Sequence, residues 1–102
     1  MQSKKFKVDL VIHKFGEMIY FSQLDLVLIL KRALRRAGLP NYFTQGFRPH
    51  IKISFKGALK LGKEGRLTVT FYFREKMLPK KVISKLNPKL PAGLEIKKLT
   101  NN

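Results

Sequence analysis

The stretch Ser22–Pro40, SQLDLVLILKRALRRAGLP, decides how the rest of the chain is interpreted. Its first four residues have the form of a capping box, with Ser22 at the N-cap and Asp25 in the first helical turn. Gly38 and Pro40 are stop signals at the other end. Apolar residues recur between these ends at the spacing of one helix face, namely Leu26, Val27, Leu30, Ala33, Leu34 and Ala37. The sequence therefore predicts a helix from Ser22 to Ala37 that packs on a sheet.

Segments with alternating polarity lie on both sides of this helix. Apolar and polar residues nearly alternate over Lys5–Ile12, and His13–Glu17 is expected to form a polar turn. After the helix, Ile51–Phe55 and Leu67–Phe73 alternate in the same way. Three glycines in the intervening Gly57–Gly65 should let these two strands return antiparallel as a long hairpin.

The C-terminal part predicts one more helix and one more strand. Pro79 suits the first turn of a short helix that Pro88 ends, and Leu94 and Ile96 indicate a final strand. The order is β-α-β-β-α-β, which predicts an α+β, ferredoxin-like (split βαβ) fold in which two helices cover one face of a four-stranded antiparallel sheet. The 102 residues fit a single domain, residues 1–102, with its core at about residues 5–99.

The charge of the chain is strongly unbalanced. It has 22 Lys and Arg against 6 Asp and Glu, a formal net charge of +16. Such a field attracts polyanions, so RNA, DNA or another acidic macromolecule is the expected partner. An anionic membrane surface is a weaker alternative, because the cations do not lie opposite a lipid-facing stripe on one helix. An acidic protein domain that docks here and neutralises the charge is a third interpretation.

Cysteine is absent, which excludes thiolate zinc sites, cysteine nucleophiles and cysteine-ligated iron–sulfur clusters. Two histidines and six scattered acids show no metal-ligand spacing, so we expect neither a metal nor another cofactor. No apolar run approaches the roughly 20 residues that span a bilayer, and nothing resembles a signal peptide. We therefore expect no membrane association, and the cytoplasm is the default compartment.

The connection Thr44–Ser54, TQGFRPHIKIS, is the strongest candidate for a functional loop. Gly46 permits a positive φ, and Pro49 restricts both itself and Arg48, so the loop should hold a fixed shape. Side chains on such loops often bind or catalyse, although a tight turn that only feeds the next strand is an equal alternative. The candidate binding residues here are Gln45, Phe47, Arg48 and His50.

Two groups in the sequence suit RNA. Arg32, Arg35 and Arg36 should point away from the core and offer paired donors to phosphates, or form only a solvated face. Arg48 beside Phe47 joins charge to stacking, the combination that holds unpaired bases, unless Phe47 faces inward. His50 could serve as a general acid or base, with His13 as a second imidazole if the fold brings both loops together.

The chain resembles the bacterial radical-SAM-linked protein family, a domain of unknown function, from about Phe6 to Leu99. The stretches that carry the resemblance are Phe21-Ser-Gln-Leu-Asp-Leu26, Arg32-Ala-Leu-Arg-Arg-Ala-Gly-Leu-Pro40, Thr44-Gln-Gly-Phe-Arg-Pro-His50 and Lys52-Ile-Ser-Phe55. The resemblance implies fusion to, or encoding beside, a cobalamin-binding radical-SAM protein, with a role in presenting or targeting its substrate. Two positions depart from the family pattern: Gln23 stands where the family has histidine, and only Glu64 remains of an acidic segment after Gly62.

The leading hypothesis from the sequence is an accessory domain that binds RNA or another polyanion. The alternative is a protein-docking module for a radical-SAM enzyme, with Phe47 or Tyr42 as an aromatic anchor. A third hypothesis is a metal-free RNA-processing enzyme that uses His50. The radical chemistry itself is not expected here, because the chain lacks the cysteines that hold the cluster.

Overall fold

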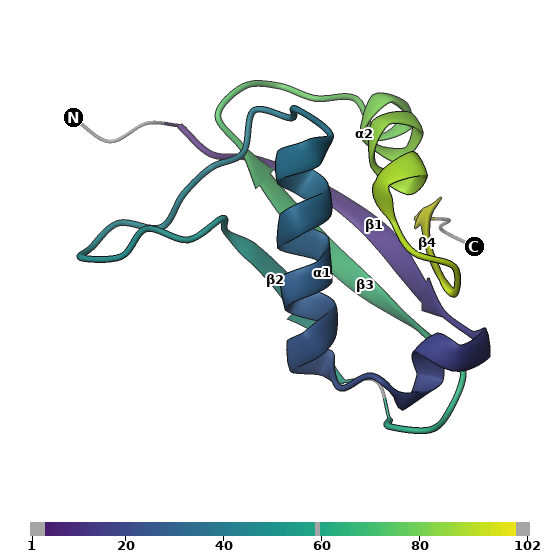
Figure 1. Cartoon of the computed structure of the whole chain (residues 1–102). Helices are drawn as coiled ribbons and strands as arrows, with labels where there is room; N and C mark the ends of the chain where they lie inside the picture. The colour runs from purple at the N-terminus through teal and green to yellow at the C-terminus, as the bar shows by residue number, and fades with distance from the viewer. Residues whose placement is uncertain (1–3, 59, 100–102) are drawn as a thin grey trace.

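The computed structural model describes residues 4–58 and 60–99 (Figure 1). In chain order its elements are β1 (Phe6–Lys14), the 3-10 helix η1 (Gly16–Tyr20), α1 (Gln23–Arg36), β2 (Ile53–Lys56), β3 (Gly65–Phe73), α2 (Pro79–Leu86), the 3-10 helix η2 (Asn87–Lys89) and β4 (Leu94–Lys98). Among the helices of these described residues, none is long and apolar enough to cross a membrane.

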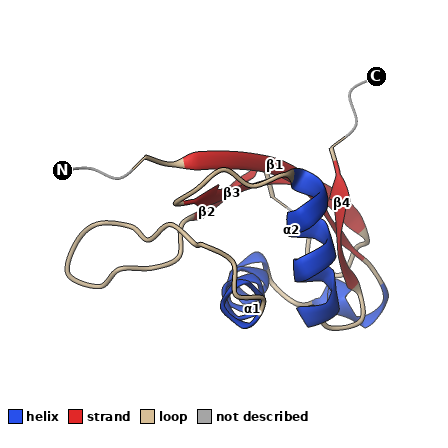
Figure 2. Ribbon diagram, turned by 90° about the horizontal axis from the view of Figure 1, so that it is seen from above, coloured by secondary structure: helices blue, strands red, loops and turns tan. Residues whose placement is uncertain are grey.

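The four strands form one antiparallel sheet in the order β2-β3-β1-β4. The central strand β1 places Lys7 opposite Tyr72 of β3, and Ile12 opposite Ile96 of β4. Figure 2 shows α1 and α2 on the same side of this sheet. The predicted βαββαβ fold, with two helices on one face, is therefore confirmed. We call the face opposite the helices the open face.

The core lies between the sheet and the two helices. Successive strand residues point to opposite faces, so alternate residues of β1 and β3, such as Leu10 and Phe71, are fully buried under the helices. Leu30 of α1 and Val82 of α2 fill the other side of this layer. Each such side chain contributes about 1.5–3 kcal/mol when it is fully buried. The face of α1 that the sequence predicts to point inward is buried at Leu26, Leu30, Ala33 and Leu34, whereas Val27 and Ala37 are half-buried.

A side chain fixes one end of each helix, the start of α1 and the end of α2. Ser22 Oγ accepts from the Asp25 backbone N–H at 3.1 Å, and Asp25 Oδ2 accepts from the Ser22 N–H at 3.0 Å, which confirms the predicted capping box. After α2, the Asn87 amide donates to the Ile96 carbonyl at 2.9 Å and accepts from the Ile96 N–H at 2.8 Å. Asn87 therefore pairs with the edge of β4 as a neighbouring strand would, and it fixes α2 on the sheet.

The polar turn predicted from His13 onward is wrong at its beginning. β1 continues through Lys14, whose side chain is only 1% exposed. The Lys14 ammonium group donates to the carbonyl oxygens of Lys60 at 3.0 Å, Ile19 at 3.3 Å and Phe21 at 3.5 Å. Because an ammonium group has three N–H donors, these three carbonyls account for all of them. A lysine thus joins η1, the start of α1 and the β2–β3 connection.

Candidate nucleic-acid interface

The long connection after α1 forms a projecting ribbon, which we call the arm (residues 41–52). At its base, the Tyr42 N–H donates to the Tyr72 carbonyl at 3.0 Å, and the Lys52 N–H donates to the Tyr42 carbonyl at 2.8 Å. Further out, Thr44 and His50 are joined by two hydrogen bonds, of 2.7 and 3.0 Å. Figure 1 shows the arm extending from the body of the domain, beside the start of β1.

The predicted strand Ile51–Phe55 is divided between the arm and the sheet. Ile51 pairs with Phe43 inside the arm, and β2 begins only at Ile53. Ile51 is nevertheless buried, because the arm base lies against the core. The alternating pattern is therefore real, but its first residue, Ile51, pairs with Phe43 on the outgoing limb of the arm instead of with β3.

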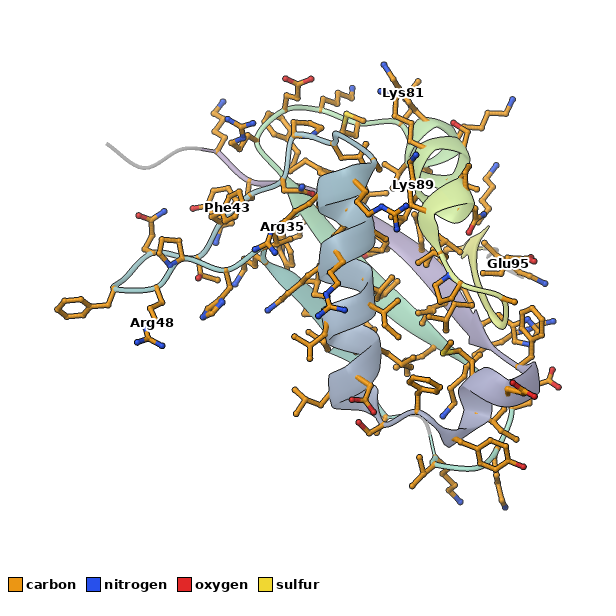
Figure 3. All side chains as sticks on the ribbon, viewed as in Figure 1. Arg35, Phe43, Arg48, Lys81, Lys89 and Glu95 are labelled. Carbon is orange, nitrogen blue, oxygen red and sulfur yellow. The ribbon has the colours of Figure 1, made fainter. Side chains whose placement is uncertain are left out.

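The tip of the arm carries the loop candidates. Gly46 has a φ of +126°, which confirms the positive φ predicted for it. Phe47 is 106% exposed, so it has no cover within the described chain, and the inward alternative for its ring is wrong. The other candidates of this loop are also exposed, namely Gln45, Arg48, Pro49 and His50. Figure 3 shows Arg48 projecting from the arm, away from the sheet.

The two histidines lie at opposite ends of the sheet. His13 stands opposite Arg66 in β3, with its Nε2 atom 2.8 Å from Glu64 Oε2. His50 lies in the arm, which joins β3 at Tyr72, six strand positions away from that pairing. The arrangement therefore does not provide an acid–base pair of imidazoles. No group of three or more His, Asp or Glu side chains among residues 4–58 and 60–99 is placed to hold a metal ion.

The three arginines of α1 do not form one cluster. Residues four apart share a helix face, whereas neighbours differ by about 100°. Arg32 and Arg36 accordingly line a depression toward η2, and Figure 3 shows Arg35 on the side of α1 that faces the arm. No ion pair within the described residues involves any of the three. The predicted phosphate-binding group is thus divided into a pair, Arg32 and Arg36, and a separate Arg35.

The open face carries an aromatic site that the sequence analysis did not identify. Tyr72 lies on this face of β3, between the ammonium groups of Lys7 and Lys52, whose Nζ atoms are 5.9 and 5.1 Å from the ring centroid. The hydroxyl of Tyr72 is 3.1 Å from Ser54 Oγ on β2. These contacts hold a half-buried ring on the open face between two cations. The sequence could have indicated this site through alternation, because every second residue of each strand, Tyr72 among them, falls on the face away from the core.

A basic row crosses the same face nearer its other end. The strand registers place Lys97, Val11, Thr68 and Lys56 side by side on β4, β1, β3 and β2. A depression of about 380 Å³ is lined by the first three residues of this row, Lys97, Val11 and Thr68, and its wall includes Arg66. The acids on this face are already engaged, since Asp9 accepts a hydrogen bond from Thr70, and Glu95 is 3.5 Å from Lys97. Cationic side chains therefore lie toward both ends of the open face.

Large apolar side chains are exposed at a third place, around the start of α1. Leu24 and Leu28 are 71% and 50% exposed, and they are four residues apart on the outer face of the helix. The Gly62 N–H donates to the Ile19 carbonyl at 2.6 Å, which brings the β2–β3 connection to η1. We call this the apolar patch; its exposed members are Tyr20, Phe21, Leu24, Leu28 and Leu61.

Comparison with known proteins gives a family and nothing finer. Neither the curated proteins nor the solved structures searched contain a significant match to this sequence. A family model matches residues 7–101, which includes both α-helices, the arm and all strand residues except Phe6. The chain therefore belongs to the bacterial family DUF2344, described as an uncharacterized protein conserved in bacteria.

Proposed function

We propose that this domain binds single-stranded RNA across the open face of the sheet, with the arm as a second point of contact. The observation that carries the proposal is Tyr72, whose ring lies on the open face between the ammonium groups of Lys7 and Lys52. Unpaired bases stack on aromatic rings, and neighbouring cations neutralise the phosphates on either side. A ring placed in this way suits a nucleotide that lies on the sheet.

The energies favour such a contact. Stacking of one base on an aromatic side chain contributes roughly 1–3 kcal/mol. The Tyr72 side chain is preorganised for stacking, because the contact of its hydroxyl with Ser54 Oγ restricts the movement of the ring. The two lysines now lie near the ring, and long flexible ammonium side chains can turn to the phosphates when a base takes their place. The pairing of β1 with β3 keeps Lys7 beside Tyr72.

The arm extends this surface. The Tyr42 N–H bonds to the Tyr72 carbonyl, and Lys52 bonds back to Tyr42, so the stacking site continues directly into the base of the arm. At the tip, Phe47 offers a fully exposed ring beside the guanidinium of Arg48. An RNA strand bound at Tyr72 therefore has a second ring, exposed at the tip of the arm. Single-stranded RNA is flexible enough to follow both, whereas a rigid duplex buries its bases.

The test compares two tyrosines. Tyr72→Leu should weaken binding of a labelled oligouridine by about fivefold or more, measured by fluorescence anisotropy at a fixed salt concentration, because it removes about 1–3 kcal/mol of stacking. Tyr20→Leu is the matched control, since Tyr20 is exposed on η1 instead of on the open face. Both variants retain the net charge. Equal affinities for the two variants would show that the open face does not bind the RNA.

A second candidate is a docking module for a radical-SAM protein, as the family resemblance in the sequence suggests. The apolar patch favours it, because a group of large exposed apolar side chains in one region is characteristic of protein interfaces. Of the two aromatic anchors considered, Tyr42 is buried and unsuitable, whereas Phe47 is accessible. Leu24→Ser with Leu28→Ser should release such a partner from a complex that survives nuclease and high salt. A complex that nuclease dissolves would instead indicate bridging by RNA.

A further inference from the structure

A basic cleft on the helix side of the domain is separate from the open face. It lies between α1 and η2 and has a volume of about 330 Å³. Its cationic members are Arg32 and Arg36, one helical turn apart on α1, and Lys89 on η2. The remaining lining is apolar and consists of Ile29, Ala33, Pro88, Leu90 and Pro91. We call this site the α1–η2 cleft.

The three cations are available to a ligand. Neither Arg32, Arg36 nor Lys89 forms an ion pair with any described acid. No carboxylate lines the cleft, so nothing on the protein competes for the guanidinium groups. The nearby negative end of α1 favours cations here but does not pair with them.

The apolar lining of the cleft also restricts which ligand fits. Ala33 is buried, and Ile29 and Leu90 are half-buried, which gives an apolar floor below the cations. Pro88 and Pro91 form part of the wall and add rigid apolar rings to it. A bare inorganic anion would use the cations and leave this apolar surface wet. A ligand that joins a phosphate to a flat, partly apolar group would use both.

We propose that the α1–η2 cleft binds one nucleoside phosphate unit, with the phosphate on Arg32, Arg36 and Lys89 and the base against the apolar floor. Arginine offers paired donors that match phosphate oxygens, and two arginines one turn apart can grip the same group. The volume is at the lower end of the range for small-molecule sites. The unit is either a free nucleotide or the phosphorylated end of an RNA strand. This site does not depend on the open face.

The first experiment measures binding of AMP, adenosine and inorganic phosphate by NMR titration of the whole domain. AMP should bind at least tenfold more tightly than either adenosine or phosphate, because only AMP uses both parts of the cleft. Arg32→Gln and Arg36→Gln should each weaken AMP binding about tenfold. Arg35→Gln is the matched control, because it changes the net charge equally from another side of the same helix, and it should alter AMP affinity less than twofold.

Several outcomes would overturn the proposal. Equal losses in the Arg35 and Arg36 variants would mean diffuse attraction by the net charge, and so would equal affinity for AMP and phosphate. Absence of saturable AMP binding, together with equal binding of oligonucleotides that carry a 5′-phosphate or a 5′-hydroxyl, would also exclude the site. The melting temperature of each variant should remain close to that of the parent, because the three side chains are exposed.

The two oligonucleotides also distinguish the sources of the ligand. A 5′-phosphate that tightens binding tenfold, with the gain lost in Arg36→Gln, assigns the cleft to RNA ends. Saturable AMP binding without a 5′-phosphate effect assigns it to free nucleotides. Tyr72→Leu should leave AMP binding unchanged in either case, so failure of the open face and failure of the cleft give different results.

Discussion

The ammonium nitrogen of Lys14 lies 3.0 Å from the carbonyl oxygen of Lys60, although 46 residues separate them in the chain. The same ammonium group also reaches Ile19 and Phe21, so one buried side chain closes the end of the domain opposite the arm. Replacing it tests whether these contacts stabilise the fold. Lys14→Met should lower the free energy of unfolding by about 1–3 kcal/mol, because carbonyls that lose their donor remain desolvated.

The control for Lys14→Met is Lys7→Met in the same strand. Lys7 is exposed on the open face, so its replacement should change the free energy of unfolding by less than about 0.5 kcal/mol. Urea denaturation followed by circular dichroism measures both. Equal stability of the two variants would show that the Lys14 hydrogen bonds contribute nothing beyond the packing of its stem.

Gly93 is the position where a side chain is least tolerable. A Cβ atom there would lie 2.6 Å from the Phe15 carbonyl oxygen and 2.8 Å from Met18 Cβ, and its φ is +97°. Gly93→Ala should therefore lower the thermal midpoint clearly more than Gly62→Ala. Gly62 also has a positive φ, +79°, but a Cβ would meet nothing within 4 Å. The two variants should differ in their free energy of unfolding by about 1–3 kcal/mol, the usual cost of overpacking. Indistinguishable midpoints would refute the close approach.

The arm should matter for binding and not for stability. Phe47→Ala removes a ring that no other described residue covers, so the thermal unfolding midpoint should be unchanged. The affinity for oligouridine should fall about fivefold or more, because a stacking contact is lost. Leu78→Ala is a control on another exposed apolar residue, just before α2. If Phe47→Ala binds as the parent does, the arm is not part of the RNA surface.

His50→Gln should reduce oligouridine affinity less than Gly46→Val, because valine resists the φ of +126° and distorts the tip.

Charge on the open face should appear in the salt dependence of RNA binding. Each phosphate that is neutralised contributes roughly 0.7 to the slope of log affinity against log salt concentration. Replacing both Lys7 and Lys52 by Gln should lower that slope by about 1.4, that is, by two phosphates. Replacing Lys80 and Lys81 of α2 removes the same charge from the helix side and should change the slope little. Equal changes would indicate that only the net charge attracts RNA.

The fold was predictable because its signals are local. The Ser22 and Asp25 capping box, the proline at the start of α2 and the alternation in each strand all act within a few residues, and the structure contains each of them. The sheet order then follows from the usual path of a βαββαβ chain. The strand limits were less predictable, as β1 and β2 show.

The site was only partly predictable, because its geometry depends on distant segments. A lysine after a strand normally indicates a turn, and the burial of Lys14 depends on a carbonyl 46 residues away. Tyr72 is informative only when the register sets Lys7 opposite it, and these two residues are 65 positions apart. The separation of Arg35 from Arg32 and Arg36 follows from helical geometry and was accessible from the sequence. The exposure of Phe47 was not, because no local rule says which loop aromatics pack.

The most direct test of the open face as an RNA surface is an NMR titration of the 15N-labelled domain with oligouridine, read residue by residue. The proposal predicts that the largest amide shifts fall on β3 and β1 around Tyr72 and Lys7 and on the arm. It also predicts intermolecular NOEs between the Tyr72 ring and a base. Shifts confined to the apolar patch at Leu24 and Leu28, with the amides of β1 and β3 unchanged, would contradict it.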